Sequence, residues 1–317
     1  MAFDLPAPVS SLRHVGTGRP TPWNLILAVL RELQGSKRYQ ARFLLRSLLR
    51  RSVLQRWSRS DSPSLTAYLA ERPELCGALL WPYQCSTWTA AERIPRIESH
   101  FSVLDSAPHE FRFGVSEHLH LADFTDRTAG AHLILDQPKW LFREGLLALN
   151  IFLHGERAYS LSFSLQREGA ETQMFIGGLQ GRRSADALAQ YKQLTDDFHG
   201  LRPRDLLIEM LKACAPLLGV TRILAVADEH RCFRHPYFGR VDHPDLVTNY
   251  NEIWSERGGT RVAATHWELP LEASIRRLDD VPCKKRALYR RRNEMLASLF
   301  ERIQEGAGRK RPGNDIA

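Results

Sequence analysis

The chain has 317 residues, of which 43% are hydrophobic and 25% are charged, as is typical of a globular protein with one large domain or two modest ones. This balance excludes a disordered, collagen-like or membrane-embedded protein. The net charge of +8 is concentrated at the ends, because residues 1–60 hold eleven basic and two acidic side chains and residues 276–317 hold twelve and six. The middle of the chain is therefore acidic, and we expect any anionic partner to meet the terminal segments.

Targeting and cysteine features predict a cytoplasmic protein with reduced thiols. The longest apolar run near the start, residues 25–30, is much shorter than the roughly 20 residues that a transmembrane helix needs. The first ten residues lack the basic and apolar regions of a secretory signal. The five cysteines include no C-x-x-C pair, which argues against a zinc ribbon or a disulfide framework.

The first third of the chain predicts helices. Thr21 and Pro22 are typical of a helix start, and a basic amphipathic helix follows over residues 37–59. This second helix could lie on an anionic membrane or on nucleic acid, but the simpler expectation is an apolar stripe packed in the core beneath an arginine-rich solvent face. Further helices are expected over residues 66–71 and 89–104, with Pro95 inside the latter.

From about residue 130 the hydrophobic pattern changes to a period of two. The segments AHLILD, LLALNIFLH, RAYSLSFSLQ and TQMFIGGLQG, joined by short turns, predict an antiparallel meander. Gly177 and Gly178 in the last segment indicate a bulge or a close approach of the backbone to a ligand, and both alternatives stay open. A helix over residues 185–198, a helix that ends at Gly219 and a buried strand over residues 221–228 follow.

The rest of the chain predicts a helix over residues 244–257, a short strand THWELPL and a basic helix over residues 282–304. We expect residues 306–317 to form a disordered basic tail. The predicted fold class is α+β, with a mostly antiparallel sheet and flanking helices. A helical N-terminal region, residues 1–110, is expected to pack on a core formed by residues 111–305.

Four segments in the C-terminal half carry a family resemblance. In order, they read LLIEMLKACAPLLGVTRILAVADEHR, NYNEIWSERGG, ELPL and DVPCKKRALYRRR. They resemble the VirK/YbjX family of Gram-negative bacteria, a family without an assigned biochemical activity. The resemblance implies a cytoplasmic bacterial protein linked to virulence, envelope function and the response to stress or antimicrobial peptides, and it supplies no catalytic mechanism.

The order of the predicted elements is also similar to that of the GNAT N-acyltransferases, which depend on acetyl-CoA. In that fold the loop after the fourth strand offers backbone N–H groups at a helix N-terminus to a pyrophosphate. The corresponding residues here are Gly200, Leu201, Arg202 and Arg204, which makes acyl-CoA, or another phosphate-bearing ligand, the cofactor hypothesis. The loop departs from the usual pattern because it has fewer glycines, follows an inserted helix and contains Pro203, which lacks an N–H.

Whether the protein is an enzyme stays open. Trp254 stands where the GNAT pattern often has a tyrosine acid, so Tyr250, one helical turn earlier, is the substitute that the sequence offers. Glu252 and His230 complete the set of candidate catalytic residues. The alternative is a non-enzymatic accessory protein whose basic helices bind an anionic membrane, nucleic acid or an acidic protein. The oligomeric state stays open.

Histidine-containing segments give no assigned metal site. The stretch from Asp228 to His243 contains carboxylate, imidazole and thiol groups, but their spacing matches no established site. His118 and His120 would share one face of a strand, yet two ligands do not define a site, and a half-exposed strand or turn is the simpler interpretation. The basic run KKRALYRRR, residues 284–292, could bind phosphate or lipid headgroups or form ion pairs within the protein, and both alternatives stay open.

Overall fold

The computed structural model of the chain describes residues 19–124, 126–182, 184–239, 248–306 and 309–312, with side chains up to residue 304. It divides into two compact units, Met1–Leu80 and Trp81–Ala317. The sequence placed this boundary near residue 110. The boundary comes earlier because helix α5 (Ala90–Ser106) packs along strand β4 (Glu156–Glu168) and therefore belongs to the second unit.

The first unit is helical in its described part. It contains α1 (Pro22–Glu32), α2 (Lys37–Leu49), α3 (Arg51–Ser58), α4 (Pro63–Glu71) and a 3₁₀ helix (Pro73–Leu79). The hydroxyls of Thr21, Ser36 and Ser62 each accept a backbone N–H at the start of a helix, as N-caps do. The single helix expected over residues 37–59 is two helices, because the backbone of Arg50 leaves the helical conformation.

Nine strands in the described part of the second unit form one sheet. They are β1 (Glu117–Asp123), β2 (Ala131–Asp136), β3 (Leu147–Leu153), β4 (Glu156–Glu168), β5 (Glu171–Gly181), β6 (Val220–Val226), β7 (Thr260–Arg261), β8 (His266–Leu269) and β9 (Arg309–Pro312). The order is β7-β8-β6-β5-β4-β3-β2-β1-β9. Only β5 and β6 pair in parallel among these neighbours, and this mostly antiparallel sheet with its helices confirms the predicted α+β class.

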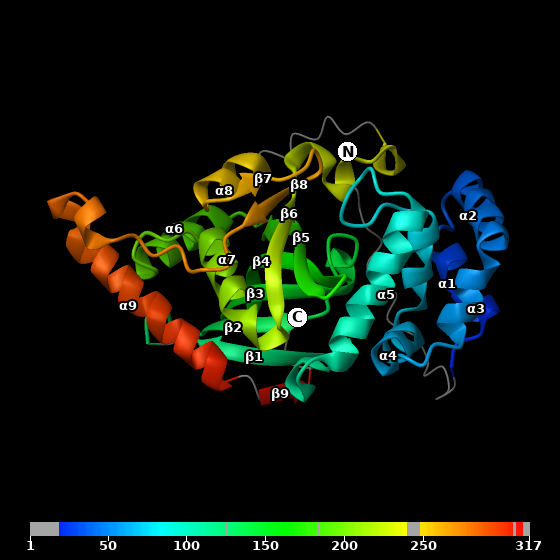
Figure 1. Ribbon diagram of the computed structural model, residues 1–317, viewed down its shortest axis with the longest axis horizontal. Helices are drawn as coiled ribbons and strands as arrows, with labels where there is room; N and C mark the ends of the chain where they lie inside the picture. Colours follow the sequence, from blue (N-terminus) through cyan, green and yellow to red (C-terminus); the bar gives the residue numbers. More distant parts are fainter. Residues whose placement is uncertain (1–18, 125, 183, 240–247, 307–308, 313–317) are drawn as a thin grey trace. The chain divides into compact units, whose positions relative to one another are not determined.

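Helices cover this sheet. Besides α5, the second unit contains α6 (Ala187–Asp197), α7 (Pro203–Cys214), α8 (Tyr250–Glu256) and α9 (Cys283–Gly306). Figure 1 shows α9 to the left of the strands and α5 to the right, and α7 packs against β3, β4 and α9. Because a parallel pair needs a long crossover, α6 and α7 connect β5 to β6. Helix α8 begins at Tyr250, capped by Asn249, whereas the expected start at residue 244 lies outside the described residues.

A bulge interrupts the pairing of β4 with β5. Ser162 pairs with Gly178 and Phe163 pairs with Ile176, so Gly177 has no partner in β4. The backbone also approaches another group closely here, because a Cβ atom on Gly177 would lie 1.9 Å from the carbonyl oxygen of Glu144. The bulge interpretation is therefore confirmed, and the close approach seen here is to the protein's own Glu144. An approach to a ligand stays a prediction.

The C-terminal tail is partly a strand. Residues 309–312, expected to be disordered, form β9 and pair antiparallel with β1. Without β9, strand β1 would present a row of unpaired N–H and C=O groups at the edge of the sheet, and pairing satisfies them. The sequence pattern missed β9 because its four residues, RKRP, show no alternation of apolar and polar side chains.

Candidate functional site

Backbone N–H groups of the predicted phosphate-binding loop donate hydrogen bonds to carbonyls of the same chain. The N–H of Gly200 donates to the carbonyl of Thr195 at 2.7 Å, and the N–H of Leu201 donates to Phe198 at 3.1 Å. Leu201 is buried, whereas Arg202 is exposed at the start of α7. Two of the backbone groups expected to face a ligand are thus engaged within the protein.

Arginine side chains around this loop also form hydrogen bonds and ion pairs within the protein. Arg204 donates to Glu256 at 3.0 Å and to Asp205 at 3.3 Å. The Arg292 guanidinium of α9 donates to the carbonyl of His199 at 2.7 Å, and a Cβ atom on Gly200 would lie 2.9 Å from its Nη2. The glycine at position 200, which has φ +75°, therefore makes room for Arg292.

Tyr250 is tied to the backbone of β5. Pairing between β5 and β6 ends at Ile176 and Ala225. Three residues later, the N–H of Leu179 donates to the Tyr250 hydroxyl at 2.6 Å, and the hydroxyl donates to the carbonyl of the same residue at 2.9 Å. The hydroxyl thus satisfies the two backbone groups that a longer β6 would have satisfied. Burial raises the pKa of Tyr250 far above its usual value, and these contacts give the side chain a structural role.

The other two candidate catalytic residues lie in different surroundings. Glu252 is exposed in the first turn of α8 and accepts a hydrogen bond from Asn249 at 3.0 Å. His230 is half-buried, and its Nδ1 has no hydrogen-bond partner among the described residues. Tyr250 is fully buried, whereas Glu252 faces solvent, so the two residues differ in their access to a substrate. A catalytic role of the three residues stays a prediction.

A buried carboxyl that the sequence did not single out lies beside the bulge. The Glu144 side chain is fully buried, and its Oε2 accepts a hydrogen bond from Gln180. Its Oε1 has no hydrogen-bond partner in the described part of the chain. Burial raises the pKa of Glu144 to about 7, although the charge of Arg231 and the Gln180 hydrogen bond oppose this rise. Glu144 fits here because Gly178 has no side chain, since a Cβ atom at that position would lie 2.3 Å from its Cδ.

A pocket adjoins this carboxyl. Its volume is about 360 Å³, and its lining consists of Trp140, Arg157, Ala158, Ser160, Gln180, Gly181 and Arg182. Gln180 therefore both lines the pocket and donates to Glu144. Both arginines have acidic partners of their own, because Arg157 pairs with Asp136 at 2.8 Å and Arg182 pairs with Glu156.

The basic run at the start of α9 has two kinds of side chains. Arg286 and Arg292 donate to backbone carbonyls of Val281 and His199. The exposed members are Lys284, Lys285, Arg290 and Arg291. Part of the run therefore stabilises the fold, and part of it faces solvent.

Leucines of α2 are exposed, which contradicts the expectation of a packed stripe. The predicted stripe comprises Phe43, Leu44, Leu48, Leu49 and Val53, and of these Phe43 and Val53 are buried. The exposed fractions are 38% for Leu44, 58% for Leu45, 72% for Leu48 and 76% for Leu49. We call these four leucines the leucine face. The expectation failed because α2 packs through the side that carries Phe43 and Ser47, its buried residues, whereas the four leucines lie on the rest of the helix surface.

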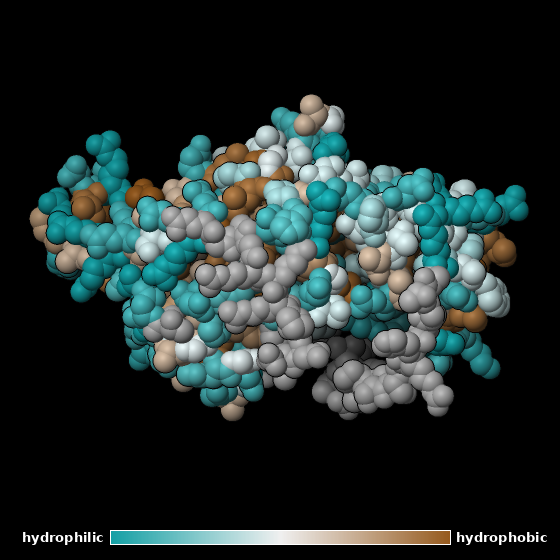
Figure 2. Space-filling view, turned by 90° about the horizontal axis from the view of Figure 1, so that it is seen from below, coloured by the Kyte–Doolittle hydropathy of each residue, from teal (hydrophilic) through white to brown (hydrophobic). Residues whose placement is uncertain are grey.

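Basic side chains surround the leucine face. Lys37, Arg38 and Arg42 are exposed on the same helix, whereas Arg46 is turned toward the carbonyls of Leu79 and Leu80. Residues 22–58 contain eight basic side chains and a single acidic one. Figure 2 shows hydrophobic surface next to hydrophilic surface at the right-hand end, where the N-terminal unit is drawn. Large exposed leucines beside lysine and arginine are typical of helices that lie in a membrane interface.

No helix in the described residues combines the length and the apolar character that crossing a bilayer requires.

Comparison with known proteins places the chain in a family. A family model described as "Protein of unknown function (DUF535)" matches residues 33–305. The chain belongs to this family. It is 27% identical over 269 residues to "Uncharacterized protein YbjX" of Escherichia coli (strain K12), covering 82% of the chain and 81% of that protein, and this confirms the predicted VirK/YbjX relationship.

Two further relatives have a narrower match. An "Uncharacterized protein" of Haemophilus influenzae is 33% identical over 153 residues, which cover 48% of the chain and 49% of that protein. A Mannheimia haemolytica protein named "Membrane protein LapB" is 25% identical over 212 residues, covering 62% of the chain and 88% of that protein. No solved structure matches the chain.

Proposed function

We propose that this DUF535 protein associates peripherally with an anionic membrane surface through the leucine face of α2. The observation that carries the proposal is the exposure of four leucines beside Lys37, Arg38 and Arg42. Transferring the exposed parts of these leucines from water into an acyl-chain boundary would contribute roughly 4–7 kcal/mol before the cost of immobilising the protein. Each basic side chain near an anionic surface would add about 1 kcal/mol.

The chemistry of the leucine face favours a membrane over the other anionic partners. Nucleic-acid phosphates attract lysine and arginine, but they give exposed leucines nothing to pack against. A lipid surface provides negative headgroups and an apolar layer at the same place. The name of the Mannheimia haemolytica relative, a membrane protein, supports the same proposal.

Vesicle binding tests this function. The full chain would be sedimented with vesicles of phosphatidylglycerol and phosphatidylcholine, and with vesicles of phosphatidylcholine alone. We expect binding to the anionic vesicles, and a loss of at least about tenfold in affinity for a Leu45→Ser, Leu48→Ser variant. The matched control is Leu188→Ser, which removes an 81% exposed leucine from α6. Equal binding by the double variant and the control would refute the proposal.

A second candidate is the binding of an acyl-CoA, and with it acyl transfer. It is supported by one feature of the topology, a single parallel pair β5–β6 joined by the α6–α7 crossover within an otherwise antiparallel sheet. Thermal unfolding with acetyl-CoA and longer acyl-CoAs, repeated with Arg202→Ala, would test it. A raised midpoint that the variant loses would place the ligand at the predicted loop, and no shift would remove the proposal.

A role at the cell envelope under host or peptide stress is part of the same proposal. Membrane association through α2 would bring the second unit of the same chain to the inner membrane. Binding that weakens steeply with salt would agree with this model, because screening reduces the attraction between basic side chains and lipid headgroups.

A further inference from the structure

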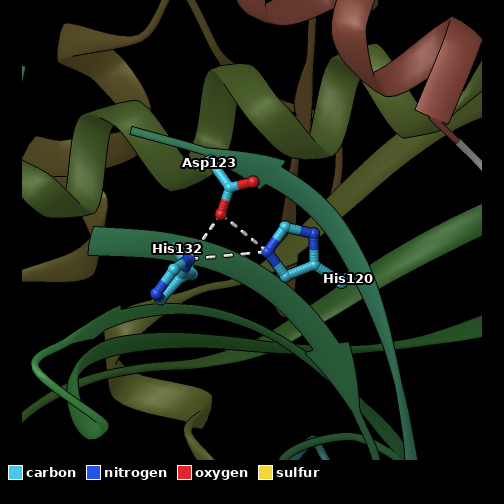
Figure 3. Close-up of side chains that lie close together, drawn as sticks. All are labelled: His120, Asp123 and His132. Atoms are coloured by element: carbon cyan, nitrogen blue, oxygen red, sulfur yellow. Dashed lines mark hydrogen bonds and ion pairs between the residues drawn. The ribbon is translucent and has the colours of Figure 1, made fainter. Parts of the chain in front are cut away.

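Three side chains on β1 and β2 converge at the edge of the sheet that is remote from β6. The Asp123 Oδ1 lies 2.9 Å from His120 Nε2 and 2.6 Å from His132 Nδ1, and the two imidazole nitrogens are 3.5 Å apart. Figure 3 shows the two rings and the carboxylate pointing toward one another. Two imidazoles and one carboxylate form a ligand set for a divalent transition-metal ion.

The convergence depends on a bulge in β1. In a regular strand His120 and Asp123, three residues apart, would point to opposite faces. Here His120 pairs with Ile134 and Ala122 pairs with Leu133, so Leu121 is an extra residue without a partner in β2. Asp123 then pairs directly with His132, which shares a face with Ile134. The bulge therefore brings all three side chains to one face of the sheet, as bulges near functional sites do.

The distances are close to those of a bound ion. Two ligand atoms about 2.1 Å from a tetrahedral zinc ion lie about 3.4 Å apart. The three separations of 2.6, 2.9 and 3.5 Å are near this value, so small side-chain rotations would complete the geometry. We propose that His120, Asp123 and His132 bind one divalent transition-metal ion, with Zn²⁺ as the first candidate.

The three-residue cluster is partly open to solvent, and a residue of α9 contacts the end of the strand that carries two of its members. The exposed side-chain fraction is 8% for His120, 33% for His132 and 47% for Asp123, so one ligand is buried and two are reached by solvent. Arg302 of α9 donates to the Asp123 backbone carbonyl at 3.0 Å and pairs with Asp126 at 3.3 Å. Its charge is thus directed to groups other than the three ligand atoms, and it holds the end of β1 in place. Three protein ligands leave coordination positions for water or a substrate.

Metal titration of the full chain tests the proposal. After treatment with a chelator and dialysis, Zn²⁺ binding would be measured by calorimetry, and Co²⁺ binding by its visible absorption. We expect about one equivalent of high-affinity sites and a thermal midpoint that Zn²⁺ raises. The variants His132→Ala and Asp123→Asn should lose at least about tenfold in affinity, the cobalt absorption and the stabilisation by Zn²⁺.

A matched control separates this site from surface binding. His109→Ala removes an imidazole whose side chain is 79% exposed and leaves the cluster unchanged. The proposal requires that this variant bind metal like the wild type. It would be overturned if wild type, His132→Ala and Asp123→Asn bound Zn²⁺ equally, because the cluster would then be a hydrogen-bonded group without a metal. Unchanged midpoints of the metal-free variants would show that they fold.

Discussion

Replacing Glu144 by glutamine should make the unfolding free energy respond differently to pH. Burial raises the pKa of Glu144 to about 7 in the folded chain, against an ordinary value near 4.5. Between these values the carboxyl is protonated when folded and ionised when unfolded, so the unfolded state binds fewer protons. The stability of the wild type therefore falls as the pH rises from 4.5 to 7. Glutamine has nearly the same shape and does not titrate.

The expected size follows from this shift. One unit of pKa corresponds to about 1.4 kcal/mol, so the advantage of Glu144→Gln over wild type should grow by roughly 2.5 kcal/mol between pH 5 and pH 8. Urea unfolding followed by tryptophan fluorescence at several pH values would measure it. Burial lowers the pKa of His100 to about 3, so this residue makes the unfolding free energy rise with pH between 3 and 6.5. This slope is present in both proteins and cancels in the difference. A pH-independent difference would show that Glu144 is ionised in the fold and would refute the argument.

Two further substitutions test the packing around β5. Gly178→Ala should destabilise the protein by about 1–3 kcal/mol, because the added Cβ would lie 2.3 Å from Glu144 Cδ. The control is Gly35→Ala, which should not destabilise the protein because no atom lies within 4 Å of the added carbon. Urea denaturation of the two variants would measure the difference. Tyr250→Phe should cost about 1–3 kcal/mol in the same assay, because it leaves the buried N–H and C=O of Leu179 unsatisfied, and an unchanged stability would mean that the hydroxyl is not needed for the fold.

Local patterns predicted most of the fold. The alternating segments became β2 to β5, and the capped apolar segments became α1, α5 and α7, because the period of the side chains and the capping residues act within a few neighbours. Strand β9 was missed because RKRP shows no alternation of apolar and polar side chains, whereas strand pairing is formed by backbone groups that leave no mark in the sequence.

The candidate sites depend on contacts that are distant in the sequence. Glu144 reaches its buried position through Gly177 and Gly178, more than thirty residues later in the chain, so the glycine pair signalled a close approach without identifying the partner. His120 and Asp123 share a face only through the bulge at Leu121, and a sequence read with a strict period of two places them on opposite faces.

The exposure of the leucine face could not be predicted from the sequence, for a different reason. The hydrophobic period of residues 37–59 correctly indicated helices, but a period alone does not say whether an apolar stripe meets a core. Arg50 ends α2, and the neighbouring helices cover Phe43 and Val53 while leaving Leu48 and Leu49 in solvent. The proposed membrane association therefore depends on a surface that only the three-dimensional arrangement reveals.

The most direct test of the account is the sedimentation of the full chain with anionic vesicles, compared with the Leu45→Ser, Leu48→Ser variant. We predict that the wild type binds phosphatidylglycerol vesicles, binds phosphatidylcholine vesicles much more weakly, and loses affinity when the two leucines are replaced. A wild type that stays in solution with both kinds of vesicle, or a variant that binds as well as the wild type, would contradict the proposed function.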